Sequence, residues 1–159
     1  MSEAADEGPL NPVNTVNGCQ LPDDLLYWPE KHVWVRGPDA DGVVEAGLTD
    51  VAQHLAGKIV VVNLRALGKT LARGKSAGTL ESGKWVGTIP TPVAGEVVAV
   101  NEALKGSPET VNRDPYGAGW LIRVKPTAWD VDREELAGGP DGLARYRELL
   151  ERDGIHCAS

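Results

Sequence analysis

Phenylalanine is absent from this sequence of 159 residues, and aromatic side chains make up only 5% of it. Large aromatic surface therefore comes mainly from five tryptophans, so each of them matters individually. No apolar run extends much beyond Ile59 to Val62, and the N-terminal stretch MSEAADEGPL is polar and acidic. Neither a membrane span nor a secretory signal is expected, and the cytoplasm is the expected location.

Positively charged residues are also fewer than negatively charged ones. Lysine and arginine number 16 against 23 aspartates and glutamates, which gives a net charge of −7. An acidic protein repels the phosphate backbone, so we do not expect nucleic acid to be a partner.

Cysteine is scarce, with only two residues, Cys19 and Cys157, near opposite ends of the chain. Neither has the CxxC spacing or the companion histidines of a zinc site, so no metal is expected. In a reducing cytosol we expect two free thiols, and a structural disulfide is the alternative.

What the sequence does contain is a series of short β-branched runs separated by glycine and proline. HVWVR (32–36) and VVEAGL (43–48) flank a turn sequence and predict a hairpin. Residues 49–57 predict a short helix that Thr49 caps and Gly57 ends. Further strands are expected within 58–64, 70–81, 79–98, 95–101 and 119–126. This pattern is typical of an all-β barrel or sandwich.

The two ends of the chain differ from this β-rich centre. Residues 1–20 lack apolar periodicity and are expected to form a flexible tail before one domain, residues 21–152. Within that domain, 129–136 and 141–154 predict helices on the outside of the β core, the second capped by Asp141. Residues 153–159 are expected to be a C-terminal tail.

One lysine has an unusual setting. In TLESGKWVGTIPTPVAGEVV (79–98), Gly83 and Lys84 fit the central positions of a type II′ hairpin turn, which favours glycine first. Lys84 would then project from the tip of a stiff β hairpin. On spacing alone, a solvated turn lysine explains this position equally well.

The sequence around Lys84 resembles the lipoyl-lysine segment of the glycine cleavage H-protein family. HVWV (32–35), GLTDVAQ (47–53), VNEAL (100–104) and VNRDPYGAGWLIRVKP (111–126) extend the resemblance over most of the chain. It implies a barrel-sandwich hybrid fold, mainly β, and a carrier without its own active site. It also implies lipoic acid joined to Lys84 by a lipoate-attachment enzyme, in a hairpin formed by Glu81, Ser82, Gly83 and Trp85.

Some positions depart from that family. Val33 stands where the family typically has glutamate, and Leu55 where some members have histidine. ESGKWVG (81–87), NGCQLPDDLLY (17–27) and DGIHC (153–157) instead resemble the lipoate-binding proteins associated with bacterial heterodisulfide-reductase-like sulfur oxidation. That resemblance implies a sulfur intermediate as cargo and the heterodisulfide-reductase-like complex as partner.

The alternatives stay open at this stage. As a glycine cleavage H-protein, the chain would carry an aminomethyl group between glycine decarboxylase, aminomethyltransferase and dihydrolipoyl dehydrogenase. As an unmodified protein, it would be an interaction or lipoate-relay module. If the termini meet, Cys19 and Cys157 could pair or exchange with the lipoyl sulfurs. His32 is interpreted as structural, packed near Trp34, and a monomer is expected.

Overall fold

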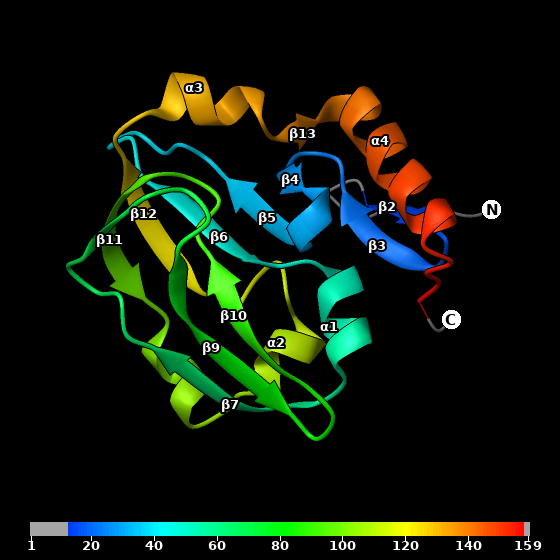
Figure 1. Ribbon diagram of the computed structural model, residues 1–159, viewed down its shortest axis with the longest axis horizontal. Coiled ribbons are helices and arrows are strands. Elements are labelled where there is room, and N and C mark those ends of the chain that lie inside the picture. The colour runs from blue at the N-terminus through cyan, green and yellow to red at the C-terminus, as the bar shows by residue number, and fades with distance from the viewer. Residues whose placement is uncertain (1–12, 158–159) are drawn as a thin grey trace.

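The computed structural model describes residues 13–157, which form antiparallel sheets with short helices around them (Figure 1). The largest sheet has seven strands in the order β13-β4-β5-β6-β12-β11-β8. Their bounds are β4 (Leu26–Trp28), β5 (Val33–Arg36), β6 (Val44–Leu48), β8 (Thr70–Leu71), β11 (Gly95–Val100), β12 (Ile122–Pro126) and β13 (Ala137–Gly138).

A second sheet has three strands in the order β10-β9-β7. These are β7 (Ile59–Leu64), β9 (Ser76–Ser82) and β10 (Val86–Pro90). The β9–β10 hairpin extends to the lower edge of the molecule in Figure 1, beside the helix α1. The expected mainly β sandwich is thus confirmed.

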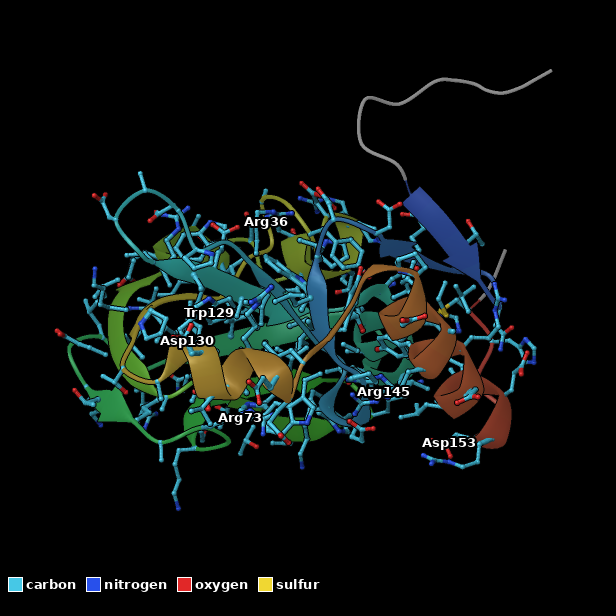
Figure 2. All side chains as sticks on the ribbon, turned by 90° about the horizontal axis from the view of Figure 1, so that it is seen from above. Arg36, Arg73, Trp129, Asp130, Arg145 and Asp153 are labelled. Atoms are coloured by element: carbon cyan, nitrogen blue, oxygen red, sulfur yellow. A yellow bond between two sulfur atoms is a disulfide. The ribbon has the colours of Figure 1, made fainter. Side chains whose placement is uncertain are left out.

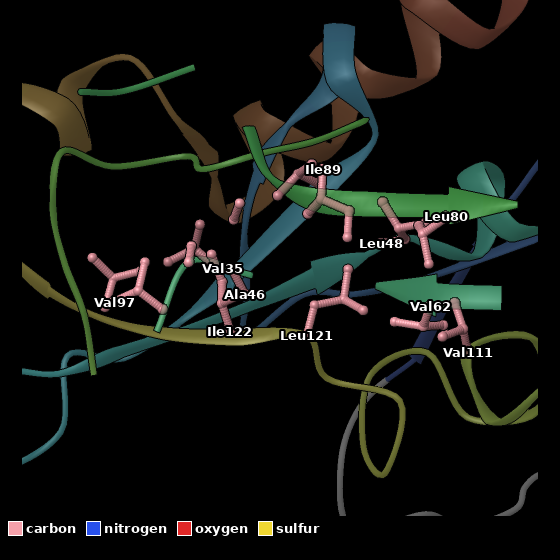
Figure 3. Packing of buried hydrophobic residues seen from close by; sticks show 14 of the residues in the cluster. Val35, Ala46, Leu48, Val62, Leu80, Ile89, Val97, Val111, Leu121 and Ile122 are labelled. Carbon is pink, nitrogen blue, oxygen red and sulfur yellow. The ribbon is translucent and has the colours of Figure 1, made fainter. Parts of the chain in front are cut away.

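The main core forms between these two sheets (Figure 3). Strand alternation explains which side chains enter it: on β12, Ile122 and Val124 are buried while Arg123 and Lys125 face outward. Leu80 of β9 contributes to the same core from the other sheet. Burial of aliphatic side chains from both sheets supplies the main driving force for this packing.

The helix α1 (Asp50–Ala56) forms where the sequence predicts it. The hydroxyl of Thr49 accepts a hydrogen bond from the Ala52 amide at 3.3 Å, and Gly57 ends the helix with a φ of 82°. The predicted hairpin before it is also confirmed, since β5 pairs antiparallel with β6.

The other helices are η1 (Pro29–Lys31), η2 (Glu102–Lys105), α2 (Thr110–Arg113), α3 (Trp129–Glu134) and α4 (Gly139–Arg152). Helix α4 begins earlier than expected, with Gly138 at its N-cap, so Asp141 lies in the first turn and does not cap it. Figure 2 shows Arg145 on α4, whose guanidinium pairs with Glu30 of η1 at 3.0 Å. None of the described helices is long and apolar enough to cross a membrane.

The predicted terminal tails are corrected by the structure. Strands β2 (Val13–Val16) and β3 (Cys19–Pro22) form an antiparallel ribbon, and residues 155–157 return beside it. Both ends contribute to a second core, which contains Val16, Cys19, Leu21, Leu25, Tyr27, Trp34, Val51, Tyr146, Leu149, Leu150 and Cys157. The remainder of the predicted tails, residues 1–12 and 158–159, lies outside the described residues.

The expectation of two free thiols is wrong: Cys19 and Cys157 form a disulfide. The amide of Cys157 donates to the carbonyl of Asn17 at 3.0 Å, and the Asn17 side-chain amide donates to the carbonyl of Ile155 at 3.3 Å. Sequence spacing could not reveal this pairing because the two cysteines are 138 residues apart. Since Val51 of α1 packs in the same core, the disulfide secures the region that supports this helix.

Candidate functional site

The tip of the β9–β10 hairpin consists of two residues, Gly83 and Lys84. The Ser82 amide donates to the Trp85 carbonyl at 2.8 Å and closes the loop. The predicted place of the turn is therefore correct, but its predicted type is wrong. A type II′ turn requires a positive φ at Gly83, and Gly83 is not among the glycines in the left-handed region.

Lys84 is exposed and has no ion pair within the described part of the chain. Its amide donates to the Ser82 hydroxyl at 3.3 Å, which orders the backbone at the tip. The aliphatic part of the side chain lies against the end of α1: a β-carbon on Gly57 would be 3.1 Å from Lys84 Cε. Lys84 is thus exposed, and its side chain passes close to the C-terminal end of that helix.

Glu81 lies in the strand just before the tip. It pairs in register with Val86 on one side and with Val61 on the other. Both valines are exposed, Val86 by 70% and Val61 by 41%, so apolar surface flanks this carboxylate next to Lys84.

Trp85 packs back onto its own strand. Its indole covers Gly87 so closely that a β-carbon there would be 2.0 Å from Trp85 Cζ2. Trp85 as a whole remains 38% exposed. Glycine at position 87 is therefore required by the position of Trp85.

We predict that Gly87→Ala displaces the Trp85 ring and lowers the free energy of unfolding by about 1 to 3 kcal/mol, the usual cost of overpacking. Chemical denaturation measures the loss, and NMR of the indole N–H measures the displacement.

The matched control is Gly83→Ala, in the same hairpin. No atom lies within 4 Å of a β-carbon there, and Gly83 has no left-handed φ to lose. This variant should stay within about 0.5 kcal/mol of the parent protein. Equal losses in the two variants would contradict the packing of Trp85 over Gly87.

A small cavity opens beside the hairpin, between it and α1. Its volume is about 180 Å³, and its lining is mostly apolar. None of the residues that line it carries a carboxylate, and its basic groups are Lys31 and His32. The lining residues are Lys31, His32, Leu48, Ala52, Leu55, Ala56, Trp85, Thr88 and Pro90.

Two positions that depart from the H-protein pattern are placed differently around this cavity. Leu55 lines it and is 44% exposed, whereas Val33 is buried in the main core and does not line it. The apolar side chain at position 55 therefore contributes directly to the character of the cavity.

His32 has a neighbour that sequence reasoning missed. Its ring stacks on Tyr146, which shares the second core with Trp34, and the ring centroids are 5.7 Å apart. Its Nδ1 lies 2.6 Å from the Tyr146 hydroxyl, which lies 3.0 Å from the Thr49 hydroxyl. Burial lowers the pKa of the His32 imidazole below its usual range, against the raising effect of Asp153 and Glu30. The ring is therefore neutral near pH 7.

The two cysteines do not belong to this site. They lie in the second core and do not line the cavity. Both sulfurs are used in the disulfide, so neither is a free thiol. Of the predicted site residues, the structure thus brings together those of the hairpin, 81–85, and separates the cysteines from them.

The comparisons with known proteins agree with one another. A family model described as glycine cleavage H-protein matches residues 26–148. The chain is 43% identical over 144 residues to glycine cleavage system H protein 5 of Aquifex aeolicus, covering 89% of this chain and 97% of that one. It is 50% identical over 129 residues to the glycine cleavage system H protein of Laribacter hongkongensis, covering 81% and 97%.

A solved structure is similar as well. The crystal structure of a glycine cleavage system H protein from Mycobacterium marinum superposes with a TM-score of 0.69 at 35% identity. The match covers 85% of this chain and 100% of that one.

Proposed function

The chain belongs to the glycine cleavage H-protein family, and on that basis we propose that it is a lipoyl carrier whose arm is attached to Nζ of Lys84. Proteins of this family carry lipoic acid on a lysine and have no catalytic activity of their own. The observation that carries the proposal is an exposed lysine, without an ion pair among the described residues, at the two-residue tip of a β hairpin.

The residues present fit a lipoyl group. Amide formation needs an accessible primary amine, which Lys84 offers, and it costs no ion pair there. The cavity beside α1 supplies apolar surface within the same region of the molecule. When bound, lipoic acid supplies a dithiolane for thiol and disulfide exchange, while the hairpin and α1 hold its attachment point in place.

For the cargo, the names of the relatives support an aminomethyl group within a glycine cleavage system. Members of this family interact with glycine decarboxylase, aminomethyltransferase and dihydrolipoyl dehydrogenase. In this role the Lys84 arm would visit each of these enzymes in turn.

A second cargo is supported by the cavity itself. An aminomethyl adduct is cationic, and a partly buried amine gains from nearby carboxylates. The cavity lining contains none, and it contains Lys31 and His32 instead. An uncharged or anionic sulfur intermediate, passed to a heterodisulfide-reductase-like sulfur-oxidising complex, suits this lining better.

Reconstitution separates the two roles. The protein is lipoylated by a lipoate-attachment enzyme, and intact mass confirms the addition before any assay. Turnover with glycine decarboxylase and aminomethyltransferase at the level of an established H protein would support the first role. The second role would be supported by two results together: only background turnover with glycine decarboxylase and aminomethyltransferase, and sulfur-dependent reduction of an electron acceptor by the heterodisulfide-reductase-like complex. A chain that the attachment enzyme leaves unmodified would instead be an interaction or lipoate-relay module.

A further inference from the structure

We propose that His32 determines which cargo the cavity accepts. In this proposal, Nε2–H of His32 donates a hydrogen bond to a sulfur-bearing group without positive charge at the end of the arm. His32 is thus a specificity-determining residue for a hydrogen-bond-accepting, uncharged or anionic sulfur species. The inference rests on the lipoyl-carrier function proposed for Lys84 and goes beyond it by assigning a residue and a charge class to the cargo.

The direction of the hydrogen bonds sets the tautomer of His32. The Thr49 hydroxyl oxygen accepts the Ala52 amide at the start of α1, so its own proton is free to donate. Tyr146 receives that proton at 3.0 Å and in turn donates its hydroxyl proton to Nδ1 of His32 at 2.6 Å. A neutral imidazole that accepts at Nδ1 carries its proton on Nε2.

The opposite direction of these hydrogen bonds, from His32 through Tyr146 to Thr49, is unfavourable. If Nδ1 of His32 donated to Tyr146, and Tyr146 donated to Thr49, the Thr49 proton would need another acceptor. Thr49 is fully buried, and no other acceptor for its hydroxyl is found among the described residues. A buried hydroxyl without an acceptor carries a desolvation cost, so the first direction prevails.

The backbone holds His32 in this position. Its φ of 55° places it in the left-handed region at the end of η1, and its carbonyl accepts the Thr49 amide at 3.0 Å. The Tyr146 hydroxyl occupies one edge of the ring. Nε2, on the other side of the ring, has no hydrogen-bond partner in the described part of the chain, and His32 lines the cavity. The free donor is therefore available to a group that enters there.

The surrounding charges favour the same class of cargo. Lys31 lines the cavity next to His32, and Leu48, Ala52, Leu55 and Ala56 contribute no charge to it. The nearby acids are engaged by arginines: Glu30 pairs with Arg145 at 3.0 Å, and Asp153 pairs with Arg152 at 3.1 Å. A cationic amine in the cavity would meet an N–H donor and an ammonium group, whereas an acceptor would meet two favourable partners.

The test uses the lipoylated full chain with adducts of defined charge. Dihydrolipoyl dehydrogenase and NADH reduce the arm, and intact mass verifies that the Cys19–Cys157 disulfide is retained. The arm is then alkylated with iodoacetate, iodoacetamide or 2-bromoethylamine, which give anionic, neutral and cationic adducts. NMR titration measures the pKa of His32 in each, and long-range proton–nitrogen correlation identifies which ring nitrogen carries the proton.

We expect the anionic adduct to raise the pKa of His32 by about one unit relative to the neutral adduct, and the cationic adduct to leave it unchanged or lower it. The neutral ring should carry its proton on Nε2.

Other outcomes overturn the proposal in distinguishable ways. Equal His32 pKa values in the three adducts would show that the arm does not reach this residue. A proton on Nδ1 would remove the donor on which the proposal depends. If intact mass shows no lipoyl group on the chain, the proposed carrier function fails, and this inference fails with it.

Discussion

Loss of the disulfide between Cys19 and Cys157 is expected to lower the free energy of unfolding by about 3 to 5 kcal/mol. A cross-link restricts the unfolded chain more as the loop it closes grows, and this loop spans 138 residues. The second core is the part most affected, because the disulfide joins the β2–β3 ribbon to the chain after α4.

Chemical denaturation of Cys157→Ala measures this effect. The parent protein treated with dithiothreitol should show a similar loss, whereas dithiothreitol should not change the variant further. An unfolding midpoint that is the same with and without the disulfide would contradict the stabilising role assigned to it.

Replacement of Lys84 by arginine is expected to abolish lipoylation while leaving the fold intact. Arginine keeps the positive charge but offers no primary amine for amide formation. Because Lys84 is exposed and without an ion pair among the described residues, stability should change by less than about 0.5 kcal/mol. NADH oxidation by dihydrolipoyl dehydrogenase, with the protein as lipoyl substrate, should fall to the level of the unmodified chain.

The matched control is Lys58→Arg. Lys58 is also exposed and follows Gly57, the residue against which the Lys84 side chain lies. This variant should be lipoylated and should support NADH oxidation at the rate of the parent protein. If the Lys84 variant still accepted lipoate, or if the Lys58 variant lost it, the assignment of the arm to the hairpin tip would be wrong.

The parts of the fold that local sequence determines could be predicted. Helix α1 formed with Thr49 and Gly57 at its ends, as cap chemistry requires. The hairpin of β5 and β6 and the two-residue tip that includes Lys84 followed from turn residues between β-branched runs. These features depend on neighbours only a few positions away.

The parts that depend on distant contacts could not be predicted. Composition gives no sign that the termini meet. The sequence therefore predicts two free thiols where the structure has a disulfide, and a flexible tail where it has the β2–β3 ribbon. The contact of His32 with Tyr146 joins residues 114 positions apart, and no periodicity encodes it. Such pairs become visible only when the second core brings α4 against η1 and α1.

The turn type at the hairpin tip was predicted wrongly for a different reason. Gly83 matched the residue preference of a type II′ turn, but the glycine does not use its left-handed freedom there. The glycine that the local packing does require is Gly87, under the Trp85 indole. The cavity, and with it the absence of carboxylates from its lining, likewise arises from packing between the hairpin and α1.

The most direct measurement is peptide mapping by mass spectrometry of the protein produced together with a lipoate-attachment enzyme. We expect a lipoyl group on the peptide that contains Lys84 and on no other peptide. A fully unmodified Lys84 peptide under conditions that lipoylate a known H protein, or lipoate on a different lysine, would contradict it.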